Sequence, residues 1–486
     1  MMNIRILYSS IIALTLFSCS DFEELNVNPN EPTEVGADVL FTSALRNAVQ
    51  TTSNEAFLLS NNIAQLTGKA LRAEVDSYNW NAFPTVWEGL YNSLTDVESA
   101  LSIATESQNN QMRGALLVLR SWIYSELTNA YGDIPFSEAI SGADLEADFT
   151  PVYDSQEAVY AALLADLSTA ADLLAQGGSI QGDILYGSDA SKWTKFANSL
   201  RLRLLMYQSA KTDVSAAFAT IAQSAPIFTS NDDQAALSFL SSFPNQFPTI
   251  PLKQGDFDAV ALSASSLAVM NQYNDPRLSR FARPDNEDFD NPTFSGIQNG
   301  FGGQSGSRLG LAYFDYPGQI TAQEKGLPYA EGLIMTYAEV EFLLAEAAAK
   351  GWISADAETH YKSGIAASHA YYQVDYAPFG HSDFEDFYAN SGVAFDETVD
   401  IWEQKWLALY FTALEPYFEV RRWYIEAGGF DGLRFLSPPS GTNFNNQQLP
   451  MRFLYPGQEQ SLNSVNYNQA KAQYDGINGK MWIVSQ

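Results

Sequence analysis

The sequence predicts a mostly α-helical fold: a tetratricopeptide-like scaffold of helix hairpins with long irregular loops and a few short strands. Apolar residues recur at the three- and four-residue spacing of amphipathic helices over much of the chain. Neighbouring helical segments form hairpins similar in length to the roughly thirty-four-residue units of tetratricopeptide arrays, without a strict internal repeat. Two long stretches, 224–251 and 283–328, lack a helical period and are rich in Gly, Pro, Asn, Asp and aromatic residues. Loops of this length are commonly functional, and we expect the short strands to lie in them.

The first residues predict an export signal and a lipid anchor. An apolar run at 6–17 follows the positive charge of Arg5 and is too short to cross a bilayer, which takes about twenty residues in a helix. Cys19, the only cysteine of the chain, stands just after this run, where a bacterial lipoprotein signal peptidase leaves a lipidated N-terminus. Phe17 is bulkier than the residue usual at its position, so an ordinary signal peptide with a chance cysteine is the alternative. Acyl chains on Cys19 would hold the mature protein at a membrane.

An acidic and polar segment follows Cys19. Asp21, Glu23 and Glu24 form the acidic patch, and 26–30 is a polar tether with too few large apolar groups to fold alone. The patch resembles the signal of Bacteroidetes lipoproteins that are exported to the outer face of the outer membrane, which implies a lipid-anchored protein facing the exterior. We expect three regions: a lipoprotein signal peptide at 1–18, a lipidated acidic tether at 19–36 and a single helical binding domain at 37–486.

Composition excludes several classes of partner. With 57 acidic and 26 basic residues the formal charge is −31, whereas a nucleic-acid-binding protein needs a basic face. The same charge argues against docking on anionic lipid by electrostatic attraction. A hydrophobic content of 46% is enough to bury a large core, and a single cysteine rules out disulfides within the chain. After the signal no apolar run reaches the length of a membrane span.

The apolar spacing places the helices at 38–66, 84–104, 111–130, 155–174, 190–208, 259–273, 336–350, 355–370, 398–413 and 417–425. Gly351 is a natural C-cap between two of these helices, which we expect to form an antiparallel pair. Pro416 cannot continue a helix interior and divides the last two segments.

Six segments in order along the chain resemble the SusD/RagB family of outer-membrane lipoproteins. They are NAYGDIPFSEA at 129–139, SDASKWTKFANSLRLRLL at 188–205, NDPRL at 274–278, MTYAEVEFLLAEAAA at 335–349, IWEQKWLALYFTALEPYFEVRRWY at 401–424 and the segment 451–468. The N-x-N-P-N motif after the lipid position is closest to the SusD-like branch. The resemblance covers essentially the whole mature chain. It implies a nutrient-binding lid on a TonB-dependent SusC-like barrel, with ligand residues on an early loop and a mid-chain loop that face one another.

Most of these motif residues have a structural interpretation. Tryptophans and apolar residues at helical spacing predict core stripes, at Trp193, Phe196, Leu200, Leu204, Trp402, Trp406, Leu409, Phe418 and Trp423. Glu339 and Glu346 share a helix face but lack the Glu-x-x-His companion of a di-metal site. Arg421 and Arg422 are expected to pair with nearby carboxylates, Glu419 or Glu415. Asp133 is expected to be a turn or cap residue, and Trp87 a core residue.

The motifs of catalysis are missing, so we expect no catalytic residue, metal or cofactor. The three histidines form no H-E-x-x-H motif, and the glycine-rich segment 300–306 lacks the Gly-Lys-Ser/Thr ending of a phosphate loop. An acidic cluster at 285–290 does not fit a calcium loop, although adventitious Ca²⁺ stays open. A glycosidase needs only two suitably spaced carboxylates, so that activity also stays open.

Two loops combine aromatic rings with polar groups, which is what sugars require, because their C–H faces stack on rings and their hydroxyls bind polar side chains. The early loop lies at 68–84 and the mid-chain loop at 308–319, which has no Trp. We expect the ligand to contact Arg72, Asp76, Tyr78, Trp80, Asn81, Tyr313 and Tyr316. The indole of Trp80 is expected to stack on the ligand, with burial under the loop as the alternative.

The sequence thus predicts a surface-exposed lipoprotein that binds oligosaccharides and delivers them to a TonB-dependent SusC-like transporter. The same scaffold suits an oligopeptide-binding protein of the RagB branch. A surface glycosidase or a purely structural helical adaptor would also be compatible with the sequence.

Overall fold

A computed structural model describes residues 35–140, 149–240, 245–310, 331–439 and 443–485, and it is mostly helical, as predicted. The signal peptide, Cys19 and the acidic tether lie outside the described residues. The helices of the first half are α2 (Ala37–Glu55), α3 (Asn61–Ile63), α4 (Pro84–Glu106), α5 (Asn110–Tyr131), α6 (Gln156–Leu174), α7 (Ala190–Gln208) and α8 (Ser215–Ser224). Those of the second half are α9 (Gln254–Phe257), α10 (Ala264–Tyr273), α11 (Leu278–Phe281), α12 (Tyr337–Ala349), α13 (Ala357–Tyr372), α14 (Phe384–Asn390), α15 (Thr398–Ala408), α16 (Glu415–Glu426), α17 (Gly457–Leu462) and α18 (Ser464–Lys471).

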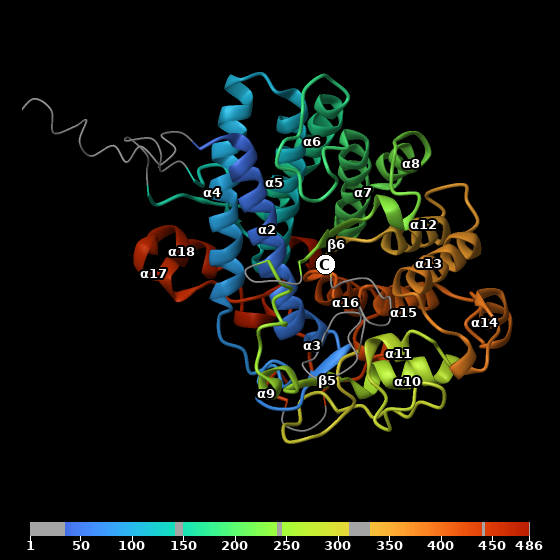
Figure 1. The fold of residues 1–486 in the computed structure, drawn as a ribbon. Coiled ribbons are helices and arrows are strands. Elements are labelled where there is room, and N and C mark those ends of the chain that lie inside the picture. Colours follow the sequence, from blue (N-terminus) through green and yellow to red (C-terminus); the bar gives the residue numbers. More distant parts are fainter. Residues whose placement is uncertain (1–34, 141–148, 241–244, 311–330, 440–442, 486) are drawn as a thin grey trace, which may run out of the picture.

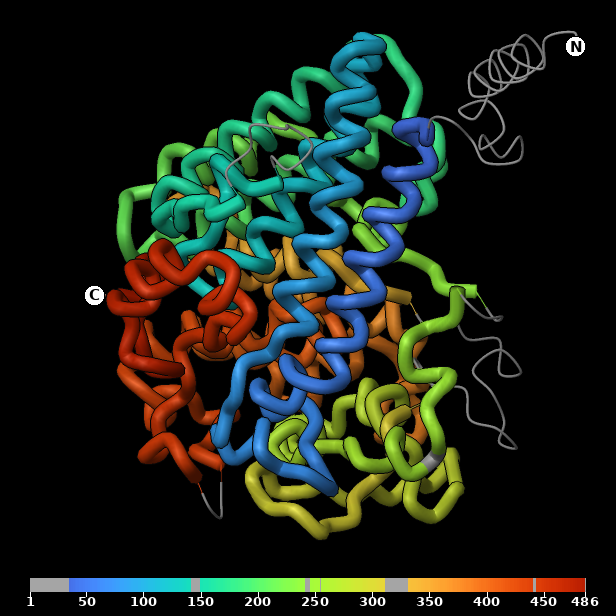
Figure 2. Tube along the Cα trace, turned by 90° about the vertical axis from the view of Figure 1, so that its left-hand side faces the viewer, coloured from blue at the N-terminus to red at the C-terminus, as the bar shows by residue number. Residues whose placement is uncertain are grey.

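The first long helices stand side by side as hairpins. Helix α2 packs on α4, α4 on α5, α5 on α6 and α6 on α7 (Figure 1). Turned by 90°, the blue α2 and the lighter blue α4 run next to one another over most of their length (Figure 2). The row continues through α12, which packs on α7, α13 and α15. This row is the tetratricopeptide-like scaffold that the sequence predicts.

The described strands pair as three short antiparallel ladders. Strand β1 (Thr67–Lys69) pairs with β5 (Val260–Leu262), β2 (Ile134–Pro135) with β3 (Tyr153–Asp154), and β4 (Ala235–Ser238) with β6 (Glu331–Met335). The expectation that strands lie within the two long loops is correct only for β4. The described part of 283–328 contributes isolated bridges instead, such as Leu309 with Ala282.

Several helix boundaries differ from the predicted ones for local reasons. The predicted helix 38–66 changes to a π-helical turn at Ala56–Ser60. The segment 259–273 begins as β5, and its helix starts only after Ser263, whose Oγ accepts a hydrogen bond from the N–H of Ser265. Pro416 lies inside the first turn of α16, where a missing N–H costs nothing.

The predicted core stripes are confirmed. All nine residues named for them are buried, and they belong to one continuous apolar cluster that runs from Phe41 to Val484. Trp87 is buried as expected. Asp133 follows α5, and its Oδ1 accepts the N–H of Gln156, the first residue of α6 (2.9 Å), whereas the N-cap residue of α6 is Ser155.

A buried guanidinium joins four elements inside this core. Arg203 of α7 donates two hydrogen bonds to Glu339 of α12, at 2.6 and 2.7 Å, and one to Glu415 of α16, at 3.0 Å. Its Nη2 also donates to the carbonyl of Ile334 in β6 (2.9 Å). Burial, together with the charge of Glu415, raises the pKa of neighbouring Glu126 well above its usual range.

A second buried network connects α12, α15 and α16. Arg422 binds Glu346 through both Nη atoms (2.7 Å each) and Glu419 at 2.8 Å, and Lys405 binds Glu419 at 2.6 Å. Burial alone would raise the pKa of Glu346, but Arg422 outweighs it and lowers this pKa to about 2. The predicted pairing is therefore confirmed for Arg422. It is wrong for Arg421, which donates instead to the carbonyls of Asn129 and Met451 (2.7 and 2.9 Å).

We predict that Arg203→Met destabilises the fold strongly. The substitution leaves Glu339 and Glu415 buried without their cation, and breaking a buried pair from one side costs about 3–5 kcal/mol. The measurement is the free energy of unfolding in urea.

The control is Arg201→Met on the same helix, which loses a single hydrogen bond to Asn198. It should cost no more than about 1.5 kcal/mol. Equal losses in both variants would show that the buried network contributes no special stability.

Glu55, the last residue of α2, is buried, and we predict that it makes the free energy of unfolding depend on pH. Burial raises the pKa of Glu55 to about 7 despite the hydrogen bond from Asn54. In the unfolded chain the pKa of a glutamate is about 4.3. Between pH ~4.3 and ~7 the carboxyl of Glu55 is therefore protonated mainly in the folded state, and its contribution to the free energy of unfolding falls as pH rises. The unfolding free energy of Glu55→Gln minus that of the wild type should therefore increase by about 2–3 kcal/mol from pH ~5 to ~8. The exposed Glu106→Gln should give a constant difference, and a constant difference for Glu55→Gln would refute the prediction.

Candidate functional site

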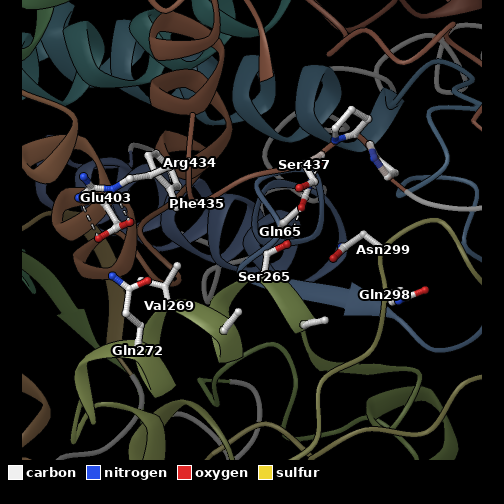
Figure 3. A pocket seen from close by; sticks show the side chains of 14 residues that line it. Gln65, Ser265, Val269, Gln272, Gln298, Asn299, Glu403, Arg434, Phe435 and Ser437 are labelled. Carbon is white, nitrogen blue, oxygen red and sulfur yellow. Dashed lines mark hydrogen bonds and ion pairs between the residues drawn. The ribbon is translucent and has the colours of Figure 1, made fainter. Parts of the chain in front are cut away.

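An open cleft of about 480 Å³ is lined by Gln65 just before β1, by α10, by the segment 298–299, by α15 and by the segment 434–439 after α16. Figure 3 shows side chains from these segments pointing into it. Its polar lining consists of Gln65, Ser265, Gln272, Gln298, Asn299, Glu403, Arg434 and Ser437, and its apolar lining of Ala264, Ala268, Val269, Phe435, Pro438 and Pro439. This volume is in the range of about 300–1,000 Å³ that is usual for small-molecule sites.

Asn299 fixes the wall of the cleft. Its Nδ2 donates to the carbonyls of Asn62 (3.1 Å) and Thr67 (2.9 Å) and to the carboxyl of Asp76 (3.2 Å). Its Oδ1 accepts the hydroxyl of Ser263 at 2.6 Å. One buried amide thus holds together the end of α3, strand β1, the early loop and the start of α10.

Gln65 connects the cleft to the C-terminal segment. Its backbone has a φ of 58°, an uncommon conformation for a residue other than glycine. The side chain donates through Nε2 to the carbonyl of Ser437 (2.6 Å) and accepts the hydroxyl of Ser265 (2.7 Å). These bonds fix the spacing of two facing walls.

The other end of the cleft is ionic. Glu403 of α15 is buried, and it accepts the hydroxyl of Tyr273 (2.6 Å) and Nε of Arg434 (3.2 Å). Burial raises the pKa of Tyr273 far above its usual range, and the hydrogen bond to Glu403 adds to the shift. Among the described lining residues, Glu403 is the only carboxylate, and the hydroxyl of Ser265 donates to the side chain of Gln65 rather than to a carboxylate.

The predicted ligand residues of the early loop are mostly buried. Trp80 is only 9% exposed, and its Nε1 donates to the carbonyl of Val75 (3.0 Å). Its ring packs edge-on against Phe83, Tyr417 and Phe453. The expectation of an exposed indole is therefore wrong, because the loop folds back on α16 and the C-terminal segment.

Asp76 and Tyr78 are buried as well. Asp76 accepts the N–H of Lys69 at 2.7 Å, and burial raises the pKa of Asp76 to about 7. Arg72 and Asn81 are exposed and accessible to a ligand. Tyr313 and Tyr316 lie outside the described residues, and ligand contact by any of the seven residues stays a prediction.

The early loop is contacted by the segment that precedes the mid-chain loop: the N–H of Gly303 donates to the carbonyl of Ala70 (2.7 Å), and Asn299 binds Asp76. Of the mid-chain loop only 308–310 belong to the described residues, so the expectation that the two loops face one another stays a prediction. Sequence reasoning named the early loop but missed the residues that line the cleft. Gln298 and Asn299 precede a glycine-rich segment interpreted only as a loop, while Glu403 and Arg434 come from distant positions that no local motif connects.

The described residues hold neither a metal-binding cluster nor a helix suited to a bilayer. No group of three or more His, Cys, Asp and Glu residues with the arrangement of a metal site occurs among them. No described helix combines the length and the apolarity that a bilayer span requires.

Solved structures share this fold. A SusD homologue from Bacteroides fragilis is 23% identical, with a TM-score of 0.74, and the match covers 93% of this chain and 100% of that one. A chitin-binding SusD homologue from Flavobacterium johnsoniae is 21% identical, with a TM-score of 0.74 and coverage of 93% and 99%. A protein described as chitin-binding is 24% identical, with a TM-score of 0.71 and coverage of 92% and 99%.

Curated protein sequences contain no match to this chain. A family model, SusD-like and described as starch-binding associating with outer membrane, matches residues 29–456. This match includes the early loop, the mid-chain loop and all the segments that line the cleft. The chain therefore belongs to the SusD-like family of starch-binding proteins that associate with the outer membrane.

Proposed function

We propose that this chain is a surface-exposed lipoprotein that binds oligosaccharides in the cleft and delivers them to a TonB-dependent SusC-like transporter. The observation that carries the proposal is the open cleft with amide and hydroxyl groups along its walls. Family membership and the chitin-binding SusD homologues of the same fold support a glycan as the ligand.

The lining suits the chemistry of a sugar. Hydroxyl groups of a glycan can both donate and accept hydrogen bonds, and amide side chains such as Gln272 and Gln298 offer both functions. Phe435 is largely buried against Trp406 and Trp423, so the apolar surface offered to the C–H face of a sugar ring comes mainly from Ala268 and Pro438. Positioning by Asn299 and Gln65 keeps the walls in place before the ligand arrives, which lowers the entropy lost on binding.

An oligopeptide is the second candidate. Phe435 is the only aromatic ring among the described residues that line the cleft, so stacking surface for sugars is limited. Side-chain amides also bind the backbone groups of an extended peptide. A calorimetric panel of maltohexaose, chitohexaose and mixed oligopeptides separates the two ligand classes. The bound ligand should be recovered intact after a day, since we propose binding without cleavage.

We predict that replacing both Gln272 and Gln298 by Ala weakens oligosaccharide binding by about tenfold or more. Both side chains are exposed at the cleft, and each lost hydrogen bond costs about 0.5–1.5 kcal/mol. Isothermal titration calorimetry measures the change in Kd. The matched control, Gln460→Ala on α17, removes an exposed glutamine away from the cleft and should leave Kd unchanged.

Trp80→Ala gives a contrasting result in the same assay. Loss of this buried ring should reduce the free energy of unfolding by about 3–5 kcal/mol. If this variant kept its stability and lost ligand affinity instead, the ligand would lie at the early loop and not in the cleft.

The anchor is a separate proposal with its own test. Cys19→Ala should leave a folded protein that leaves the membrane fraction, because we assign all membrane affinity to the acyl chains. Fractionation is done after salt and carbonate washing in a strain without the partner barrel. Retention of the variant in the membrane would contradict the assignment, and the wild-type protein is the control.

A further inference from the structure

The single basic side chain among the described lining residues is held by three carboxylates. Nε of Arg434 donates to Glu403 (3.2 Å), Nη1 to Glu397 (3.2 Å), and Nη2 to Asp400 and to Glu403 (3.4 Å). Figure 3 shows Arg434 and Glu403 joined at one end of the cleft. Burial lowers the pKa of Arg434, but hydrogen bonds and charges of Glu403 and Asp400 outweigh it and raise this pKa above its usual range.

This arrangement changes what Arg434 can offer to a ligand. A guanidinium has five N–H donors, and it recognises a carboxylate best through two parallel hydrogen bonds. Four of those donors already point at Glu397, Asp400 and Glu403. Only one Nη1 hydrogen is not engaged by these carboxylates. Arg434 can donate one bond to a hydroxyl or carbonyl, but it cannot form a fork with an anionic sugar.

The charge at this end of the cleft is also negative. Three carboxylates face one guanidinium, and Glu397 is the most accessible of them, with 63% of its side chain exposed. On the opposite wall the buried carboxyl of Asp76 lies behind Asn299, and burial raises its pKa to about 7. A bound anion would therefore meet repulsion from Glu397, and because this carboxylate is exposed, the repulsion is strongest at low ionic strength.

We propose that the acidic rim formed by Glu397, Asp400 and Glu403 around Arg434 makes the cleft selective for neutral and amine-bearing oligosaccharides and excludes uronic-acid and sulfated ones. Glu397 is the specificity-determining residue, because it is the exposed member of the rim. This inference rests on the proposed function, since it names the class of glycan for the same cleft.

The test compares maltohexaose and chitohexaose as neutral probes, fully deacetylated chitohexaose as the amine-bearing probe, and hexagalacturonate as the anionic probe. Calorimetry at about 0.02 M NaCl should show the anionic probe binding at least tenfold more weakly than the better neutral one. The ratio of the Kd of the anionic probe to that of the better neutral probe should decrease at about 0.5 M NaCl, because salt screens the charges of the acidic rim. The same Kd ratio should decrease in Glu397→Gln and decrease further in Glu397→Lys, because each substitution makes the charge of the rim less negative.

Glu106→Lys changes the net charge equally at an exposed site at the far end of α4 and should keep the wild-type Kd ratio. Glu397 also caps α15, so thermal melting of each variant shows that the helix remains folded. Hexagalacturonate binding as tightly as the neutral probes would overturn the inference. An equal change of the Kd ratio in Glu106→Lys and Glu397→Lys would also overturn the inference. Failure of every oligosaccharide to bind would instead refute the proposed function, and the inference with it.

Discussion

Arg203 at the centre of the helical core is the contact on which the rest of the structure depends. Its guanidinium meets a carboxylate from α12, a carboxylate from α16 and a carbonyl from β6, so these elements have one mutual arrangement that satisfies all four groups. A buried charge that loses its partner is strongly destabilising, so a displacement of any one of these elements would carry a high free-energy cost. The network around Arg422 extends the same constraint to α15.

The cleft receives its rigidity from these networks. Helix α15 carries Lys405 on its core side and Glu403 at the cleft, and Gln404 between them accepts a hydrogen bond from Arg277 (2.6 Å). Arg277 in turn pairs with Asp275, which follows α10, so the NDPRL motif ties the α10 wall to the α15 wall. Amides that line the cleft, such as Gln272, lie on this fixed support, and they can be substituted without removing any of the charged groups behind them.

The sequence is sufficient for the helices and for much of the core, because amphipathic spacing and capping residues act within a few positions of each other. Trp193 and Trp406 are examples, since their spacing alone indicates burial. Trp80 shows the limit. No local period accounts for it, and its partners Tyr417 and Phe453 are more than three hundred residues away. The cleft could not be predicted from the sequence for the same reason. It is lined by Gln65, Asn299 and Arg434, which are far apart in the sequence and come together only through long-range packing.

Helix α2 runs from the N-terminal end of the described residues toward the cleft. It begins at Ala37, where the N-terminal segment joins the scaffold, and its far end continues through the π-helical turn and α3 into β1 beside the cleft. At 1.5 Å per residue, the 19 residues of α2 alone span ~28 Å. An anchor that precedes Ala37 would therefore attach to the scaffold at the end of α2 that is remote from the cleft, which leaves the mouth of the cleft free for a long polymer.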